Sequence, residues 1–78
     1  MQIDSREIEM VAVESSNIES IGYDSETSKL IVQFLSNGYV YAYDNVSAAQ
    51  HTAIMSAESH GKFLAKHIKP NHPATRIR

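Results

Sequence analysis

The chain has 78 residues and no cysteine, which is the size of one small domain without disulfides. We expect a protein of the cytoplasm with no membrane partner, because no apolar run could span a bilayer and the N-terminus does not resemble a signal peptide. The net charge of -2 conceals an asymmetry, since residues 1–26 hold seven acidic and one basic side chain and residues 27–78 hold two acidic and six basic.

The first nine residues are polar, and we expect them to be a flexible lead to a domain over residues 10–69. Four segments then have the β-branched and aromatic composition of strands: 10–13, 18–24, 29–35 and 39–43. Polar turn residues separate them, which predicts an antiparallel meander. Gly22, inside the second segment, indicates a bulge or a close approach of another backbone segment.

The pattern changes to a helical one after residue 46. Ser47 and Gln50 have the spacing of a capping box, which predicts a helix over residues 48–57. A second helix is predicted to begin after Ser59 and to end by residue 69, because Pro70 comes next. Residues 70–78 show no periodicity and are expected to form a tail. The predicted fold class is therefore α+β, an antiparallel meander of three to four strands followed by two helices packed on one face.

Three tyrosines alternate after the Asn-Gly pair at residues 37 and 38. A two-residue turn there would pair Phe34 with Tyr41 and Val32 with Tyr43. Tyr41 and Tyr43 would then share an apolar face with Phe34 and be structural, while Tyr39, beside the turn, would be exposed. A three-residue loop with a bulge is the alternative, and it would send the tyrosines to the face opposite Phe34.

With the first register, the helices would cover that face and complete one core. Its predicted members are Leu30, Val32, Phe34, Tyr41, Tyr43, Ile54, Phe63, Leu64 and Ile68.

Several short motifs occur in order along the chain: Ser15-Ser16, Gly22-Tyr23-Asp24, Tyr41-Ala42-Tyr43 and Ser59-His60-Gly61. In this order they resemble the KTSC domain, a module named from the C-terminus of some lysyl-tRNA synthetases and also found as a small free-standing bacterial or phage protein. The resemblance covers residues 10–69. Ser47 departs from the proline that is frequent there, although both residues begin helices well. The resemblance implies a small α+β module of unknown function, for which RNA binding has been suggested through the synthetase.

Basic side chains in the second part of the chain suggest a nucleic-acid interface. Lys62, Lys66 and Lys69 are spaced to form one stripe on the second predicted helix, and the tail adds Arg76 and Arg78. Tyr39 is the candidate to stack an unpaired base. The alternative is that the lysines are simply the solvated face of an amphipathic helix.

A protein-interaction or accessory module is the second function class, for example a phage protein that acts on a host factor. A sheet with short edge strands can accept a strand from a partner. We expect a monomer or weak dimer, because no long apolar stripe remains once both helices are docked.

No catalytic residues are predicted. Ser15 and Ser16 have no base at a fixed spacing, and there is no cysteine nucleophile. His60 and His67 share a helical face and could form half of a metal site, but zinc ligands are usually paired more tightly. The alternative for His67 is a core-edge ring bonded to a carbonyl. We therefore expect a non-enzymatic protein with no cofactor and no metal.

Overall fold

The computed structural model of the protein describes residues 1–3 and 5–78, and Asp4 lies outside the described residues. The elements occur along the chain in this order: β1 (Gln2–Ile3), β2 (Arg6–Glu7), β3 (Val11–Ala12), β4 (Ile18–Asp24), β5 (Lys29–Phe34), β6 (Val40–Tyr43), α1 (Ala48–Ser56), α2 (His60–Phe63), a π-helical segment (Leu64–Ile68) and β7 (Ala74–Arg76). Across the described residues, no helix has the length and apolar character that crossing a bilayer requires.

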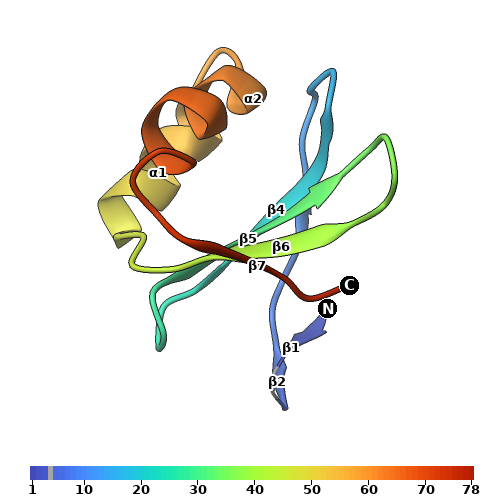
Figure 1. The fold of residues 1–78 in the computed structure, drawn as a ribbon, viewed down its shortest axis with the longest axis vertical. Coiled ribbons are helices and arrows are strands. Elements are labelled where there is room, and N and C mark those ends of the chain that lie inside the picture. The colour runs from blue at the N-terminus through green and yellow to red at the C-terminus, as the bar shows by residue number, and fades with distance from the viewer. Residues whose placement is uncertain (4) are drawn as a thin grey trace.

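The larger sheet has five antiparallel strands in the order β3-β4-β5-β6-β7, and β1 and β2 form a separate hairpin. The helices lie together on one side of this sheet, and the N-terminal hairpin lies on the other (Figure 1). The α+β class is therefore confirmed, with a meander followed by two helices on one face.

The register of β5 and β6 differs by two residues from the predicted one, since Val32 pairs with Tyr41 and Leu30 with Tyr43. The loop is longer than a two-residue turn: the N–H of Gly38 donates to the carbonyl of Phe34 over 3.1 Å, and the N–H of Phe34 donates to Tyr39 over 3.0 Å. A two-residue type I′ turn needs positive φ at both central residues. Of the two residues of the Asn-Gly pair, both of which the structure describes, Gly38 alone has a positive φ, which is 72°. A shift of two residues keeps every side chain on its face, so the predicted faces are correct.

The helix-facing side of the sheet holds the main core. Its buried members are Ile18, Ile21, Leu30, Val32, Tyr43, Val46, Ile54, Leu64 and Ile68, and the predicted Phe34, Tyr41 and Phe63 pack against them half-buried. Burial of each large apolar side chain contributes roughly 1.5–3 kcal/mol.

The N-terminal residues differ from the flexible lead that the sequence suggested. Ile8 is buried on the sheet's other face against Ile31 and Val40, so these residues cover a second small core. Gly22 permits this close approach, because a Cβ there would lie 2.9 Å from the backbone oxygen of Glu9 and 2.6 Å from the sulfur of Met10. The close backbone approach expected at this glycine is therefore present.

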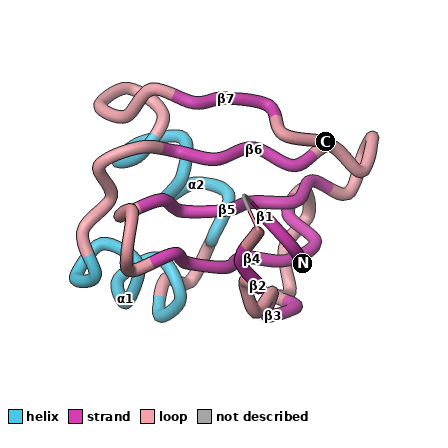
Figure 2. Tube along the Cα trace, turned by 90° about the horizontal axis from the view of Figure 1, so that it is seen from below, coloured by secondary structure: helices cyan, strands magenta, loops and turns pink. Residues whose placement is uncertain are grey.

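The C-terminal residues also differ from the expected tail, because Ala74–Arg76 form β7 and pair with β6. β6 would otherwise expose an unpaired row of backbone groups, and β7 satisfies them. The ladder begins beside the proline, where the N–H of Asp44 donates to the carbonyl of Pro73 over 2.9 Å. Figure 2 shows β4, β5, β6 and β7 side by side in this order.

The capping box of α1 is confirmed. The N–H of Gln50 donates to the Ser47 hydroxyl over 3.1 Å, and the N–H of Ser47 donates to the Gln50 side chain over 2.9 Å. After α2 the helix widens, and the N–H of Lys69 donates to the carbonyl of Leu64, five residues earlier, over 2.9 Å. A wide turn rotates the next residues by roughly 100° relative to a continuous α-helix. Lys69 is therefore rotated away from the predicted lysine stripe and towards the sheet.

Candidate functional site

An open pocket lies where the wide helical turn meets the sheet, and its volume is about 520 Å³. We call it the aromatic pocket, and its lining residues are Phe34, Ser36, Asn37, Tyr41, Tyr43, Lys69, His72, Pro73 and Ala74. They come from β5, the β5–β6 loop, β6, the loop after the helix and the start of β7. Its volume falls within the range of about 300–1,000 Å³ that is common for ligand pockets.

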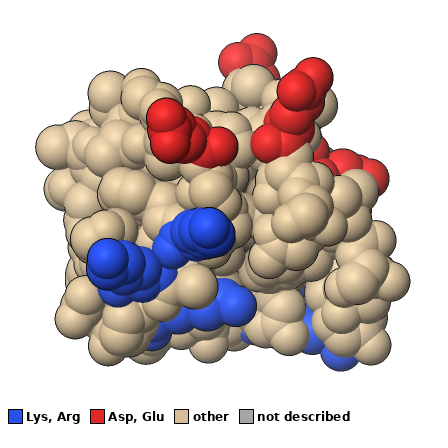
Figure 3. Space-filling model, turned by 90° about the horizontal axis from the view of Figure 1, so that it is seen from above, with Lys and Arg blue, Asp and Glu red and all other residues tan. Residues whose placement is uncertain are grey.

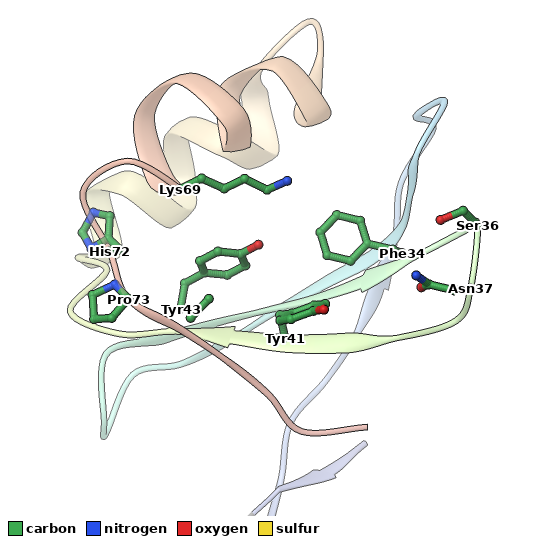
Figure 4. Close-up of a pocket in the computed structure, with 9 residues that line it drawn as sticks. Phe34, Ser36, Asn37, Tyr41, Tyr43, Lys69, His72 and Pro73 are labelled. Atoms are coloured by element: carbon green, nitrogen blue, oxygen red, sulfur yellow. The ribbon is translucent and has the colours of Figure 1, made fainter.

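Three rings surround the hollow (Figure 4). Phe34 and Tyr41 meet edge to face, with ring centroids 5.7 Å apart and planes at 78°. Both rings are half-buried, whereas Tyr43 is only 3% exposed. Two of the rings are thus partly exposed to a ligand, while the third ring is anchored in the core.

The polar groups of the aromatic pocket are partly free. The hydroxyls of Tyr41 and Tyr43 bond no other group in the described part of the chain, and Figure 4 shows the Tyr43 hydroxyl directed into the hollow. Burial, together with the neighbouring Tyr41, raises the pKa of Tyr43 above its ordinary value of 10.0, so this hydroxyl keeps its proton and can donate. Asn37 accepts the N–H of Tyr39 through Oδ1 over 2.9 Å, which leaves its side-chain NH₂ available.

The charge around the aromatic pocket is positive. Lys69 reaches over the rings, with its Nζ 5.5 Å from the centroid of Phe34 (Figure 4). None of the described lining residues is a carboxylate. Seen from the helix side, acidic and basic side chains occupy different parts of the surface (Figure 3). An anionic ligand would therefore meet little repulsion at this pocket.

His72 lines the aromatic pocket and is hydrogen-bonded to α1. Its Nδ1 lies 2.8 Å from the carbonyl oxygen of Asp44, which can only accept, so Nδ1 carries the proton. Its Nε2 then accepts from the side-chain NH₂ of Gln50 over 3.1 Å. Because the same Gln50 side chain completes the capping box, the pocket wall and the start of the helix are held by one network.

The structure brings together only part of the basic set that the sequence suggested. Lys69 lines the aromatic pocket, and Arg76 lies beside it, opposite Tyr41 in the ladder and over the ring of Tyr39. The prediction that Tyr39 is exposed is wrong: its ring is half-buried, because the guanidinium of Arg76 covers one ring face.

The other basic candidates lie elsewhere. Lys62 and Lys66 are exposed and border a separate shallow hollow, lined also by Phe63 and His67. Arg78 turns to the N-terminal hairpin, where its guanidinium donates to the carbonyl of Gln2 over 3.4 Å.

The histidines of the second helix are arranged differently from the prediction. His60, not His67, bonds a carbonyl, with its Nδ1 2.7 Å from the oxygen of Ile54. His67 is exposed, and its ring lies 4.7 Å from that of Phe63. Among residues 1–3 and 5–78, no group of three or more potential ligand side chains could hold a metal ion.

The sequence pattern did not reveal the rest of the pocket lining. Ser36, Asn37, His72, Pro73 and Ala74 come from two segments for which the sequence predicted a turn and a tail. The two prolines were the only local signal, because they mark a sharp change of direction after the helix. Tyr41 and Tyr43 were predicted to be structural, and both also face the hollow.

Known proteins are similar to this chain in sequence and in fold. The family model for the KTSC domain matches residues 14–72. An uncharacterized protein of Stutzerimonas stutzeri is 39% identical over 62 residues, which are 80% of this chain and 86% of its own. A protein of Tsukamurella paurometabola is 35% identical over 68 residues, or 87% of this chain and 100% of its own. The crystal structure of a KTSC domain protein from Yersinia pestis is similar with a TM-score of 0.86 and 36% identity, and it covers 92% of this chain and 100% of that one.

Proposed function

The protein belongs to the KTSC domain family, and we propose that it is a non-enzymatic module that binds single-stranded RNA. The observation that carries this proposal is the aromatic pocket, whose described lining combines exposed ring surface, hydroxyls without a bonded partner and a lysine, and includes no carboxylate. Unpaired bases bind proteins by stacking on aromatic side chains, and their phosphates are attracted to lysine and arginine. Lys69 and Arg76 supply that charge next to the rings.

The arrangement favours a single strand over a duplex. The exposed parts of the Phe34 and Tyr41 rings can stack on a base only if its faces are not already stacked in a helix. Each base stacked on an aromatic side chain contributes about 1–3 kcal/mol. One pocket of this size holds one or two bases, so we expect affinity in the micromolar range and a strong dependence on salt.

The test is a fluorescence-anisotropy titration of a labelled mixed-sequence RNA oligonucleotide and of tRNA, at low and at physiological salt. Lysine and arginine side chains that contact phosphates release the counterions condensed on the RNA. Two to four phosphate contacts therefore predict a slope of log K against log salt of about -1.4 to -2.8. Lys69→Gln should weaken binding to all sequences and reduce the slope by about 0.7.

Arg78→Gln is the matched control. It removes the same charge at the N-terminal hairpin and should leave the slope nearly unchanged. Lys62→Gln and Lys66→Gln then report whether the strand continues along the helix side. The proposal fails if neither RNA binds at low salt with protein at tens of micromolar.

A protein-interaction module is the second candidate, and the free edge of β7 favours it. β7 is the last strand of the sheet, and its three residues are exposed. A partner could add a strand there through backbone hydrogen bonds. This candidate would lead if the RNA titration shows no binding.

The ligand also bears on the location, the cofactor requirement and the assembly state of the protein. We propose that the protein acts in the cytoplasm, where RNA is abundant, and that its binding of RNA through stacking and charge needs neither a cofactor nor a metal. We propose a monomer or weak dimer, because the large apolar side chains that the described chain leaves exposed are Val11 and Leu35. Sedimentation equilibrium at micromolar concentration tests this assembly state.

A further inference from the structure

The β5–β6 loop carries a chemically labile dipeptide where it lines the aromatic pocket. Asn37 is followed by Gly38, and both residues are exposed. Of the four asparagines in the chain, only Asn37 precedes a glycine, whereas isoleucine, valine and histidine follow the others. The backbone nitrogen after an asparagine can attack the side-chain amide carbon, and a side chain on that next residue hinders the attack. Glycine has no Cβ, so Asn37 has the least hindered neighbour.

The loop also holds the reacting atoms in a suitable arrangement. Oδ1 of Asn37 accepts the N–H of Tyr39 over 2.9 Å, which is an Asx-turn. This hydrogen bond closes a ring of atoms that contains both Cγ of Asn37 and the nitrogen of Gly38. It also places a donor on the oxygen that becomes negative when Cγ is attacked. Among the described residues other than its chain neighbours, no atom lies within 4 Å of where a Cβ of Gly38 would be, so the space beside it is open.

One contact opposes the attack. The N–H of Gly38 donates to the carbonyl of Phe34 over 3.1 Å, so this bond must open before the nitrogen can react. The residues after the other asparagines are protected in the same way, because the N–H groups of Ile18, Val46 and His72 also donate hydrogen bonds. Hydrogen bonding therefore slows the reaction at every asparagine, and the glycine remains the feature that distinguishes this loop.

We propose that Asn37 is a site of spontaneous deamidation, which places a negative charge at the aromatic pocket as the protein ages. The nitrogen of Gly38 loses its proton to hydroxide and bonds to Cγ of Asn37. The Cγ–Nδ2 bond then breaks, ammonia leaves after taking a proton from water, and a cyclic imide remains. Water adds to either imide carbonyl and cleaves the bond from that carbonyl to nitrogen, which yields aspartate or isoaspartate. Both products carry a carboxylate, and the described pocket lining otherwise has none.

The experiment incubates the full-length folded protein for several weeks at neutral pH and physiological temperature. Peptide mass spectrometry locates the products, and enzymatic methylation of isoaspartate measures their amount. Protein unfolded in urea is the positive control, because its chain lacks the bond between Gly38 and Phe34. We expect several-fold more product at Asn37 than at any other asparagine, formed more slowly than in urea. The proposal is refuted if the folded protein stays unmodified at Asn37 while the unfolded protein reacts there, or if another asparagine reacts first.

Asn37→Gln is the test variant. Its longer side chain would have to close a six-membered ring, which forms far more slowly, and it cannot yield isoaspartate. The variant should therefore lose most of the isoaspartate signal. Asn71→Gln, at another exposed asparagine, is the matched control and should keep the signal. A signal that persists in Asn37→Gln would overturn the assignment to this residue.

The deamidation itself is independent of the proposed function, whereas its effect on RNA binding rests on that function. Aged unmodified-sequence protein should bind single-stranded RNA several-fold more weakly than fresh protein, because the new carboxylate repels phosphates. Aged Asn37→Gln protein should bind as tightly as when fresh. Deamidation without weaker binding would refute the effect on the pocket and leave the site standing. If fresh protein binds no RNA, the proposed function fails, and the isoaspartate measurement still decides the deamidation.

Discussion

The guanidinium of Arg76 lies over the ring of Tyr39, with its central carbon 3.6 Å from the ring centroid. Such a contact contributes about 0.5–1 kcal/mol at an exposed site. This contact joins β7 to Tyr39, the residue before β6. The other face of the Arg76 guanidinium points away from the Tyr39 ring, beside the aromatic pocket. A planar guanidinium can stack on a base in a way that an ammonium cannot.

Arg76→Lys is therefore predicted to weaken single-stranded RNA binding although the charge is kept. The expected loss is about 1 kcal/mol, measured by anisotropy at constant salt. Arg78→Lys, at the N-terminal hairpin, should change binding little. Unchanged affinity of Arg76→Lys would show that only the charge of this residue matters.

Tyr41 and Tyr43 are predicted to differ in their importance for stability. Tyr43→Ala removes a ring that is 3% exposed and should cost about 3–5 kcal/mol, which is comparable to the whole stability of a small domain. Tyr41→Ala removes a half-buried ring at the pocket and should cost about 1–2 kcal/mol. Urea unfolding followed by circular dichroism measures both, and equal losses would contradict the assignment of Tyr41 to the pocket rim.

The stability of the fold is predicted to fall in acid through Asp24. Burial alone would raise the pKa of Asp24, but hydrogen bonds from Thr27 and Glu26 and the charge of Arg6 outweigh it and lower the pKa below 3.8. Since the folded-state pKa is the lower one, this stabilisation is complete above the unfolded-state value of about 3.9 and is lost as the pH falls through the folded-state pKa.

Asp24→Asn tests this dependence. At neutral pH it should lower the free energy of unfolding by about 1–3 kcal/mol, because the Arg6 and Thr27 donors lose a charged acceptor. Its thermal midpoint should then vary less below about pH 4 than that of the unmodified protein. Glu19→Gln, at an exposed position of β4, should retain the normal acid dependence. Parallel acid profiles for Asp24→Asn and the unmodified protein would refute the role of Asp24.

Removal of residues 74–78 is predicted to destabilise the domain by about 2–4 kcal/mol. The deletion takes away the ladder between β6 and β7 and exposes the apolar cluster against which Ile77 packs. Urea unfolding measures the loss, and Arg76→Ala serves as a control that keeps the backbone pairing. A deletion variant as stable as the full chain would show that these residues are no more than a tail.

The sequence alone was sufficient for β4, β5, β6, the start of α1 and the two faces of the sheet. Alternating apolar residues predicted β4, β5 and β6 because the side-chain period of a strand is two, and this period also placed Phe34, Tyr41 and Tyr43 on one face. The spacing of Ser47 and Gln50 predicted the start of α1 because a capping box involves only neighbouring residues.

Only the tertiary structure decided the features that make the pocket. The pairing of β7 with β6 joins segments about thirty residues apart, and no local preference of Ala74–Arg76 indicates a strand. The wide turn at Leu64–Ile68 rotates Lys69 out of the stripe that a regular helix predicts. The β5–β6 loop is longer than its Asn-Gly pair suggested, since it is closed by bonds between Phe34 and residues 38 and 39 and the Asn37 side chain accepts the N–H of Tyr39. The pairing of β7 depends on contacts between distant segments, whose free energy outweighs the small local preferences that a sequence pattern reports, whereas the wide turn and the Asn37 bond are local departures from the regular helix and the two-residue turn that the pattern predicts.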